Sequence, residues 1–241
     1  MDVFTDLAAE YAALDAVLGG LTDAQWAHPS AADGWTVADV VLHLAQSEEL
    51  AAASIAGRDA AFDRTGQVDA RAGELVAAQR GIAPGALLAR WRAAARPMPG
   101  ALRAVPKGTR LSWVATPLSP ATLATTRLAE HWAHAYDITA PLAIPYPDTA
   151  RIRHIAWLGH RTLPYAFATE GLDGGPVYCE LTGPGGQTWT FGDPAAPSVI
   201  TGPAADFCRV GARRLSPADS ALTATGPHGA AALSVLRNYA A

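Results

Sequence analysis

The sequence has few cysteines, few charges and no long apolar segment, and each shortage excludes a class of protein. Only two of the 241 residues are cysteine, too few for the disulfide framework that holds small secreted domains together. Because their neighbours are apolar, we expect Cys179 and Cys208 to be buried free thiols. No apolar run reaches the length of about 18 residues that a membrane-spanning helix needs, so we expect no membrane contact.

The sequence also lacks the features of a secreted or nucleic-acid-binding protein. Its first 20 residues are acidic and amphipathic, without the basic and apolar segments of a signal peptide. Lys107 is the only lysine, the formal net charge is -4, and the basic residues form no stripe. We therefore expect a cytoplasmic protein with a small-molecule substrate and no nucleic-acid partner, present as a monomer or a homodimer.

Helical periodicity dominates the first two thirds of the sequence. Half of the residues are hydrophobic and 17% are charged, which is enough apolar material for a substantial core. Apolar residues recur at spacings of three and four, as on one face of a helix. Proline is expected to end one helix at Pro97 and to end or kink another at Pro164, and residues 100–118 are expected to be irregular or extended. The predicted helices cover residues 4–18, 34–56, 67–80, 84–96, 119–138 and 149–163.

The pattern changes after residue 171. The segments VYCELT and QTWTF alternate in polarity around a glycine-rich turn, which predicts a β-hairpin. A short helix is expected after Pro203, a strand at 221–225 and a helix at the C-terminus. We therefore predict an α+β protein, in which a mainly α four-helix bundle at residues 1–165 precedes a small α+β domain at residues 172–241.

The segment RLAEHWAHAYDI places polar residues where a helix should face the core. Glu130 and His134 are four residues apart, so they share a helix face with Leu123 and Ile138. A buried carboxylate and imidazole are costly unless they pair or bind a cation. A simple Glu130–His134 hydrogen bond therefore stands beside a metal site as an interpretation, and His131 is an alternative partner for His134.

Other side chains are weaker candidates. His43, at the flank of the apolar stripe of the second helix, is the natural third partner, although spacing alone does not bring it to Glu130. Arg127 is expected either to pair with Glu130 or to bind a substrate carboxylate, and Arg213 to reach an anionic substrate; both are candidate catalytic residues.

Asp137 is expected either to orient His134 or to face solvent. Trp35, Trp113 and Trp132 are expected to pack in the core or line a pocket, and His28, His154 and His160 to lie at the surface or its boundary.

Two separated segments together resemble a known family. GWTVADVVLHLA and TTRLAEHWAHAYDIT are similar to DinB-like proteins, and most closely to the mycothiol-dependent maleylpyruvate isomerase-like proteins, which include an actinobacterial metal-binding branch. The resemblance covers nearly the whole chain, including LLARWRAAA and a C-terminal unit, TGPAADFC followed by TATG, that is similar to sterol-carrier-like modules. It implies one divalent metal on His43, Glu130 and His134, with His131 outside the ligand set. Zinc is expected, with nickel, iron or manganese as alternatives.

The resemblance also implies a reaction. A metal on three protein donors keeps open positions, where it can deprotonate a thiol or a water. We therefore expect an isomerase or thiol transferase whose metal activates mycothiol or a similar low-molecular-weight thiol toward a small electrophile, with the C-terminal domain capping the bundle. The alternatives are a thiol-independent hydrolase, lyase or cyclase of secondary metabolism, and a non-catalytic binder of a small ligand.

Overall fold

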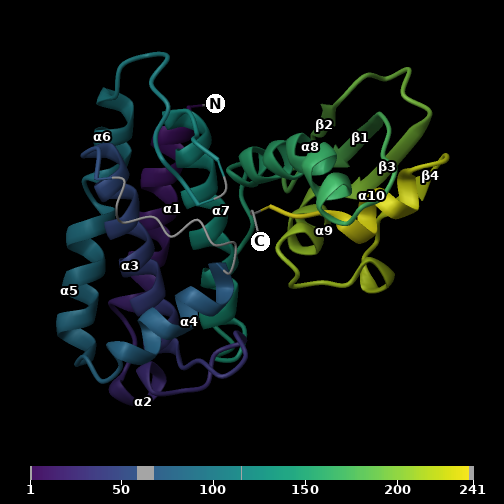
Figure 1. Ribbon diagram of the computed structural model, residues 1–241. Helices are drawn as coiled ribbons and strands as arrows, with labels where there is room; N and C mark the ends of the chain where they lie inside the picture. The colour runs from purple at the N-terminus through teal and green to yellow at the C-terminus, as the bar shows by residue number, and fades with distance from the viewer. Residues whose placement is uncertain (1, 59–67, 115, 239–241) are drawn as a thin grey trace. The chain divides into compact units, whose positions relative to one another are not determined.

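The chain divides into two compact units, one ending at Tyr146 and the other beginning at Pro147. The computed structural model describes residues 2–58, 68–114 and 116–238 (Figure 1). The first unit is mainly helical and the second combines helices with a small sheet, so the predicted α+β class is confirmed. The division lies before the helix that begins at Ile152, which the sequence assigns to the bundle, so that helix belongs to the second unit.

The first unit is built from four packed helical segments. Helix α3 packs against α5 and α7, while α1 packs against α7 and α6, and α5 and α6 follow one another as the fourth segment. The helices are α1 (Val3–Leu18), α2 (Asp23–Trp26), α3 (Val37–Ile55), α4 (Val68–Ala78), α5 (Pro84–Ala95), α6 (Met98–Ala104) and α7 (Pro120–Thr139). The predicted four-helix arrangement of this part of the chain is therefore present.

Local capping fixes where the two central helices begin. The Thr36 hydroxyl accepts from the Asp39 backbone N–H, and the Asp39 carboxylate accepts in return from the Thr36 N–H. This reciprocal pair satisfies two backbone donors that the first turn of α3 would leave unpaired. At the start of α7 the Ser119 side chain accepts from the Thr122 backbone N–H, and Pro120 takes the first helical position. These starts fix which residues of α3 and α7 face the core.

The helix that begins at Pro84 ends before Pro97, as predicted, but two other predictions made from the sequence were wrong. Residues 98–104 form α6, so the start of the segment 100–118, expected to be irregular or extended, is helical. Pro97 stands at the N-cap of this helix and Pro99 in its first turn, where no backbone N–H is needed. Of the two outcomes expected at Pro164, an end of the helix is wrong, because the helix continues to Thr169. The turns beyond Pro164 bury Ala166 and Phe167, and this burial offsets the lost hydrogen bond.

The second unit packs helices against a four-stranded sheet. Its strands lie in the order β2-β1-β3-β4, with β1 antiparallel to β2 and parallel to β3. The predicted hairpin is β1–β2, the predicted strand at 221–225 is β4, and β3 was not predicted. The elements are α8 (Ile152–Thr169), β1 (Val177–Thr182), β2 (Thr188–Phe191), β3 (Ser198–Pro203), α9 (Ala204–Gly211), a 3-10 turn (Pro217–Asp219), β4 (Thr223–Thr225) and α10 (Gly229–Val235).

Both cysteines are buried free thiols, as predicted. They lie in β1 and α9, and burial raises the pKa of Cys179 to about 12, so at neutral pH this side chain is an inert thiol. Among the described residues, no helix has both the length and the apolar composition that crossing a bilayer requires.

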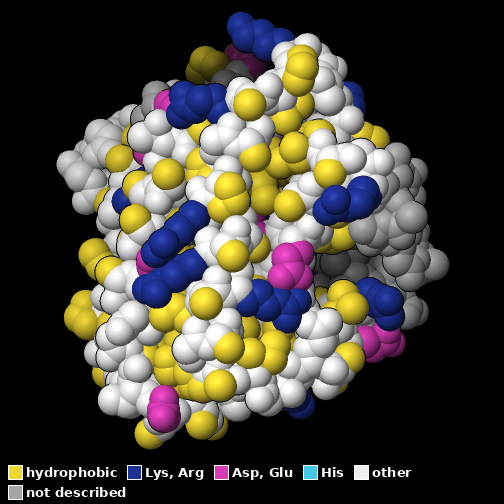
Figure 2. Space-filling view, turned by 90° about the vertical axis from the view of Figure 1, so that its left-hand side faces the viewer, with side chains coloured by type: hydrophobic (Ala, Val, Ile, Leu, Met, Phe, Trp, Pro, Cys, Tyr) yellow, Lys and Arg dark blue, Asp and Glu magenta, His cyan; other side chains and the backbone are white. Residues whose placement is uncertain are grey.

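Several basic side chains on the first unit are paired with acidic ones. On the face drawn in Figure 2, Arg and Lys side chains are separated by hydrophobic and uncharged ones and form no continuous band. Within this unit, Arg90 bonds to Glu49 at 2.7 Å and Arg92 bonds to Asp15 at 2.6 Å. Such exposed or half-buried pairs contribute little stability each, but they neutralise the positive charge of α5.

Candidate metal centre

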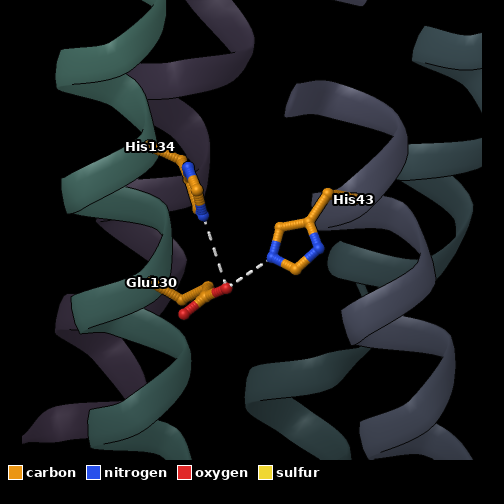
Figure 3. A group of neighbouring side chains, drawn as sticks. All are labelled: His43, Glu130 and His134. Carbon is orange, nitrogen blue, oxygen red and sulfur yellow. Dashed lines mark hydrogen bonds and ion pairs between the residues drawn. The ribbon is translucent and has the colours of Figure 1, made fainter. Parts of the chain in front are cut away.

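Helices α3 and α7 bring two histidines to one carboxylate oxygen. Glu130 Oε1 lies 2.7 Å from His43 Nε2 and 3.5 Å from His134 Nε2. Figure 3 shows His43 pointing from α3 toward α7, where Glu130 and His134 lie one turn apart. The packing of α3 on α7 therefore joins residues that are 87 positions apart in the sequence.

The three side chains are neither exposed nor sealed in the core. Their exposed fractions are 15% for His43, 25% for Glu130 and 12% for His134. A buried carboxylate surrounded only by apolar groups would take up a proton, whereas this one has two imidazoles beside it. Each of the three side chains is therefore partly open to solvent.

Asp137 orients the imidazole of His134. Its Oδ2 lies 2.8 Å from His134 Nδ1, and its side chain is fully buried. Since a carboxylate only accepts, the Nδ1–H of His134 donates this bond, which leaves Nε2 facing Glu130. Of the two roles expected for Asp137, the structure therefore shows the contact with His134. Carboxylate–histidine pairs of this kind commonly support metal ligands.

The tryptophans named in the sequence analysis take different positions. The ring of Trp35 lies beside the site, with its centroid 5.2 Å from that of His43 and 6.4 Å from that of His134. The ring of Trp113 lies 5.0 Å from Cζ of Arg127. Trp132 is buried in the core. The Trp35 ring therefore lies beside both histidines of the site.

Burial and hydrogen bonding set the charge state of the group. Burial disfavours a charged His134, but the bonds to Asp137 and Glu130 outweigh it and raise its pKa to about 9. Burial lowers the pKa of His43 despite the bond to Glu130. Burial also opposes ionisation of Glu130, yet the two histidines and Arg127 hold its pKa well below the usual range. At neutral pH the site therefore holds an ionised Glu130, a neutral His43 and a proton on His134.

The donor set fits a divalent cation. Two imidazole nitrogens and one carboxylate oxygen lie within 4.8 Å of one another. Neutral imidazole and carboxylate are the ligands that zinc and other first-row metals accept in sites with open positions. Because His134 is protonated at neutral pH, a cation that binds here has to displace that proton.

His131 does not belong to this group. Its Nε2 accepts from the indole N–H of Trp91 at 3.1 Å, and its Nδ1–H donates to the backbone oxygen of Arg127 at 2.9 Å. It is fully buried, and burial lowers its pKa to about 3. His131 is therefore not the partner of His134 that the sequence offered as an alternative. It is a neutral core histidine, and both of its ring nitrogens have hydrogen-bond partners. His28 is exposed and His154 and His160 are half-buried, as predicted.

The two arginines named as candidates lie in different surroundings. Arg127 is 3% exposed and lies between two carboxylates, those of Glu48 and Glu130. Arg213 is an exposed residue of the second unit, just after α9. Glu48 was not among the residues predicted for the site, although its position four residues after Leu44 on the apolar stripe of α3 was a signal of burial. Catalytic roles for Arg127 and Arg213 stay predictions.

Comparisons with known proteins agree on one family. The family model described as mycothiol maleylpyruvate isomerase N-terminal domain matches residues 7–139. Two Mycobacterium tuberculosis proteins, uncharacterized protein MT0041 of strain CDC 1551 / Oshkosh and uncharacterized protein Rv0036c of strain ATCC 25618 / H37Rv, are each 39% identical to the chain over 213 residues. The match covers 84% of this chain and 81% of each relative.

The fold is also similar to that of solved structures. The crystal structure of the mycothiol-dependent maleylpyruvate isomerase matches with a TM-score of 0.61, and that of a histidine-to-alanine mutant with 0.60. Each match covers 94% of both chains at 17% sequence identity. At this identity the likeness establishes the fold, and function has to be argued from the site.

Proposed function

The chain belongs to the mycothiol-dependent maleylpyruvate isomerase family, and on that premise we propose that it is a metal-dependent enzyme that activates a low-molecular-weight thiol. The thiol is of the mycothiol type, and the reaction is the isomerisation of a small electrophile or thiol transfer to it. His43, Glu130 and His134 are the proposed ligands of one divalent metal, with zinc as the first candidate.

The observation that carries this proposal is the convergence of both imidazoles on Glu130 Oε1. A divalent cation held by three protein donors keeps open positions and lowers the pKa of a thiol or water bound there. The surrounding residues set the charge states and the orientation of the donor side chains. Glu130 stays ionised, His43 offers a neutral nitrogen, and Asp137 holds the His134 ring so that its Nε2 faces the site once its proton has left.

The proposal predicts turnover that needs both metal and thiol. Zinc-loaded protein should isomerise maleylpyruvate, the substrate named for the structural relative, only when mycothiol is added, as measured by chromatography of the two isomers. Glu130→Gln should lose activity by about 100-fold or more, because loss of a ligand costs at least as much as the 10–100-fold loss caused by disturbing the groups that support ligands. His28→Ala, which alters an exposed histidine, should keep wild-type activity.

Other outcomes of the same assay would point elsewhere. Turnover without any thiol would favour a metal-dependent hydrolase, lyase or cyclase. Substrate binding without turnover, unchanged in Glu130→Gln, would favour a non-catalytic binder.

A further inference from the structure

A buried charged pair lies beside the candidate metal centre. Glu48 follows His43 by five residues on α3, and Arg127 precedes Glu130 by three residues on α7. The side chain of Glu48 is fully buried and that of Arg127 is 3% exposed. Around them, Tyr11 of α1 contacts the His131 ring at 4.5 Å between centroids. Helices α3 and α7 therefore bring together two buried ionisable side chains, neither of which is one of the three donor residues.

Arg127 bridges the buried Glu48 and the donor Glu130. Its Nε lies 3.5 Å from Glu48 Oε1, and its Nη2 lies 3.7 Å from Glu130 Oε2. Its Nη1 is 3.5 Å from the backbone oxygen of Ser47, and the Trp113 ring lies against its Cζ. The guanidinium is thus held on several sides and has little freedom to turn.

The two oxygens of Glu130 therefore have different partners. Oε1 faces His43 and His134, whereas Oε2 faces the Arg127 guanidinium. An Arg cation attracts the nearest carboxylate oxygen, so its position determines how the carboxylate group is turned about its last bond. With Oε2 drawn toward Arg127, Oε1 is the oxygen presented to the histidines.

The pair is poorly suited to a purely stabilising role. Arg127 Nε is buried without a hydrogen bond among the described residues, and its distance of 3.5 Å from Glu48 Oε1 exceeds that of a charge-assisted hydrogen bond. Buried ion pairs with such unsatisfied atoms are often replaced by apolar side chains with no loss of stability, or with a gain. A position-setting role explains why both charges are placed next to Glu130.

We propose that Arg127, held in place by Glu48, is a positioning residue that orients the Glu130 carboxylate for metal binding. This inference rests on the proposed function, because it assigns a support for the proposed ligand set. In this role Arg127 acts on Glu130 and does not bind the substrate. The role therefore differs from the binding of a substrate carboxylate, which the sequence also suggested.

The test compares zinc affinity and cobalt spectra in matched arginine variants. Arg127→Met removes the guanidinium beside Glu130, and Arg92→Met removes one that pairs with Asp15 between α5 and α1. Zinc dissociation constants are measured by competition with a chromophoric chelator, and the visible bands of cobalt-loaded protein report the ligand geometry. We expect Arg127→Met to weaken zinc binding by about 10- to 100-fold and to alter the cobalt bands, while Arg92→Met matches the wild type.

A double variant separates positioning from folding. Arg127→Met alone removes the charged partner of the buried Glu48, which can destabilise the fold. Glu48→Gln/Arg127→Met removes both charges, so it should fold, as circular dichroism would show, and should still show the weakened zinc affinity. Wild-type affinity and wild-type cobalt bands in the double variant would overturn the inference while leaving the metal site intact. A wild-type protein that binds no zinc would instead overturn the proposed function, and the inference with it.

Discussion

Zinc at about 1,000 times its dissociation constant should raise the free energy of unfolding of the first unit by about 4 kcal/mol, and His43→Ala should abolish most of this gain. The reason is that a cation bound by His43, Glu130 and His134 joins α3 to α7 and binds the folded state only. For a unit of this size the gain corresponds to a rise in melting temperature on the order of 10 °C. Thermal unfolding followed by circular dichroism, with and without zinc, measures it.

A histidine outside the site provides the control for this result. His28 is exposed, with its ring Nδ1 2.7 Å from the backbone oxygen of Pro29. His28→Ala should therefore keep the full response to zinc. An equal zinc response in His43→Ala and wild type would show that the cation binds elsewhere on the chain.

Metal-free wild-type protein should lose about 3 kcal/mol of stability as the pH rises from 4.5 to 7, relative to Glu48→Gln. Burial raises the pKa of Glu48 from its ordinary value of 4.5 to about 7, although Arg127 opposes this rise. In the unfolded chain the carboxyl loses its proton near pH 4.5, while in the folded protein it keeps that proton until about pH 7. The folded state therefore binds more protons over this range, and its stability falls as the pH rises. Each unit of the shift corresponds to about 1.4 kcal/mol.

Urea unfolding at several pH values between 4 and 8 measures this difference. Glu49→Gln changes the neighbouring carboxylate, which is exposed and paired with Arg90, and should follow the wild-type pH dependence. A constant stability difference between wild type and Glu48→Gln across this range would mean that Glu48 titrates alike in the folded and unfolded states.

The parts of the site that lie on one helix could be predicted from the sequence, and the contacts between helices could not. Glu130 and His134 share a face because of their spacing alone, and the apolar neighbours Leu123 and Ile138 turn that face inward. Whether His43 reaches them depends on the rotation and depth at which α3 packs on α7. No local pattern in the sequence determines those two quantities, so only the family resemblance placed His43 in the group.

For Glu48, too, burial could be predicted from the sequence but the contact with another helix could not. Its place in the apolar stripe of α3 indicates burial, but its partner Arg127 lies on another helix. The error at Pro164 has a different origin, because it came from a local rule about proline. In α6 the prolines occupy positions that need no donor, and in α8 the burial of Phe167 outweighs one missing bond.

Elemental analysis of the purified protein tests the central claim most directly. Zinc-loaded wild type should contain close to one equivalent of metal after removal of excess ion, while Glu130→Ala and His134→Ala should lose most of it and keep their helical circular dichroism. An unchanged metal content in both variants, or no retained metal in the wild type, would contradict the assignment of this site.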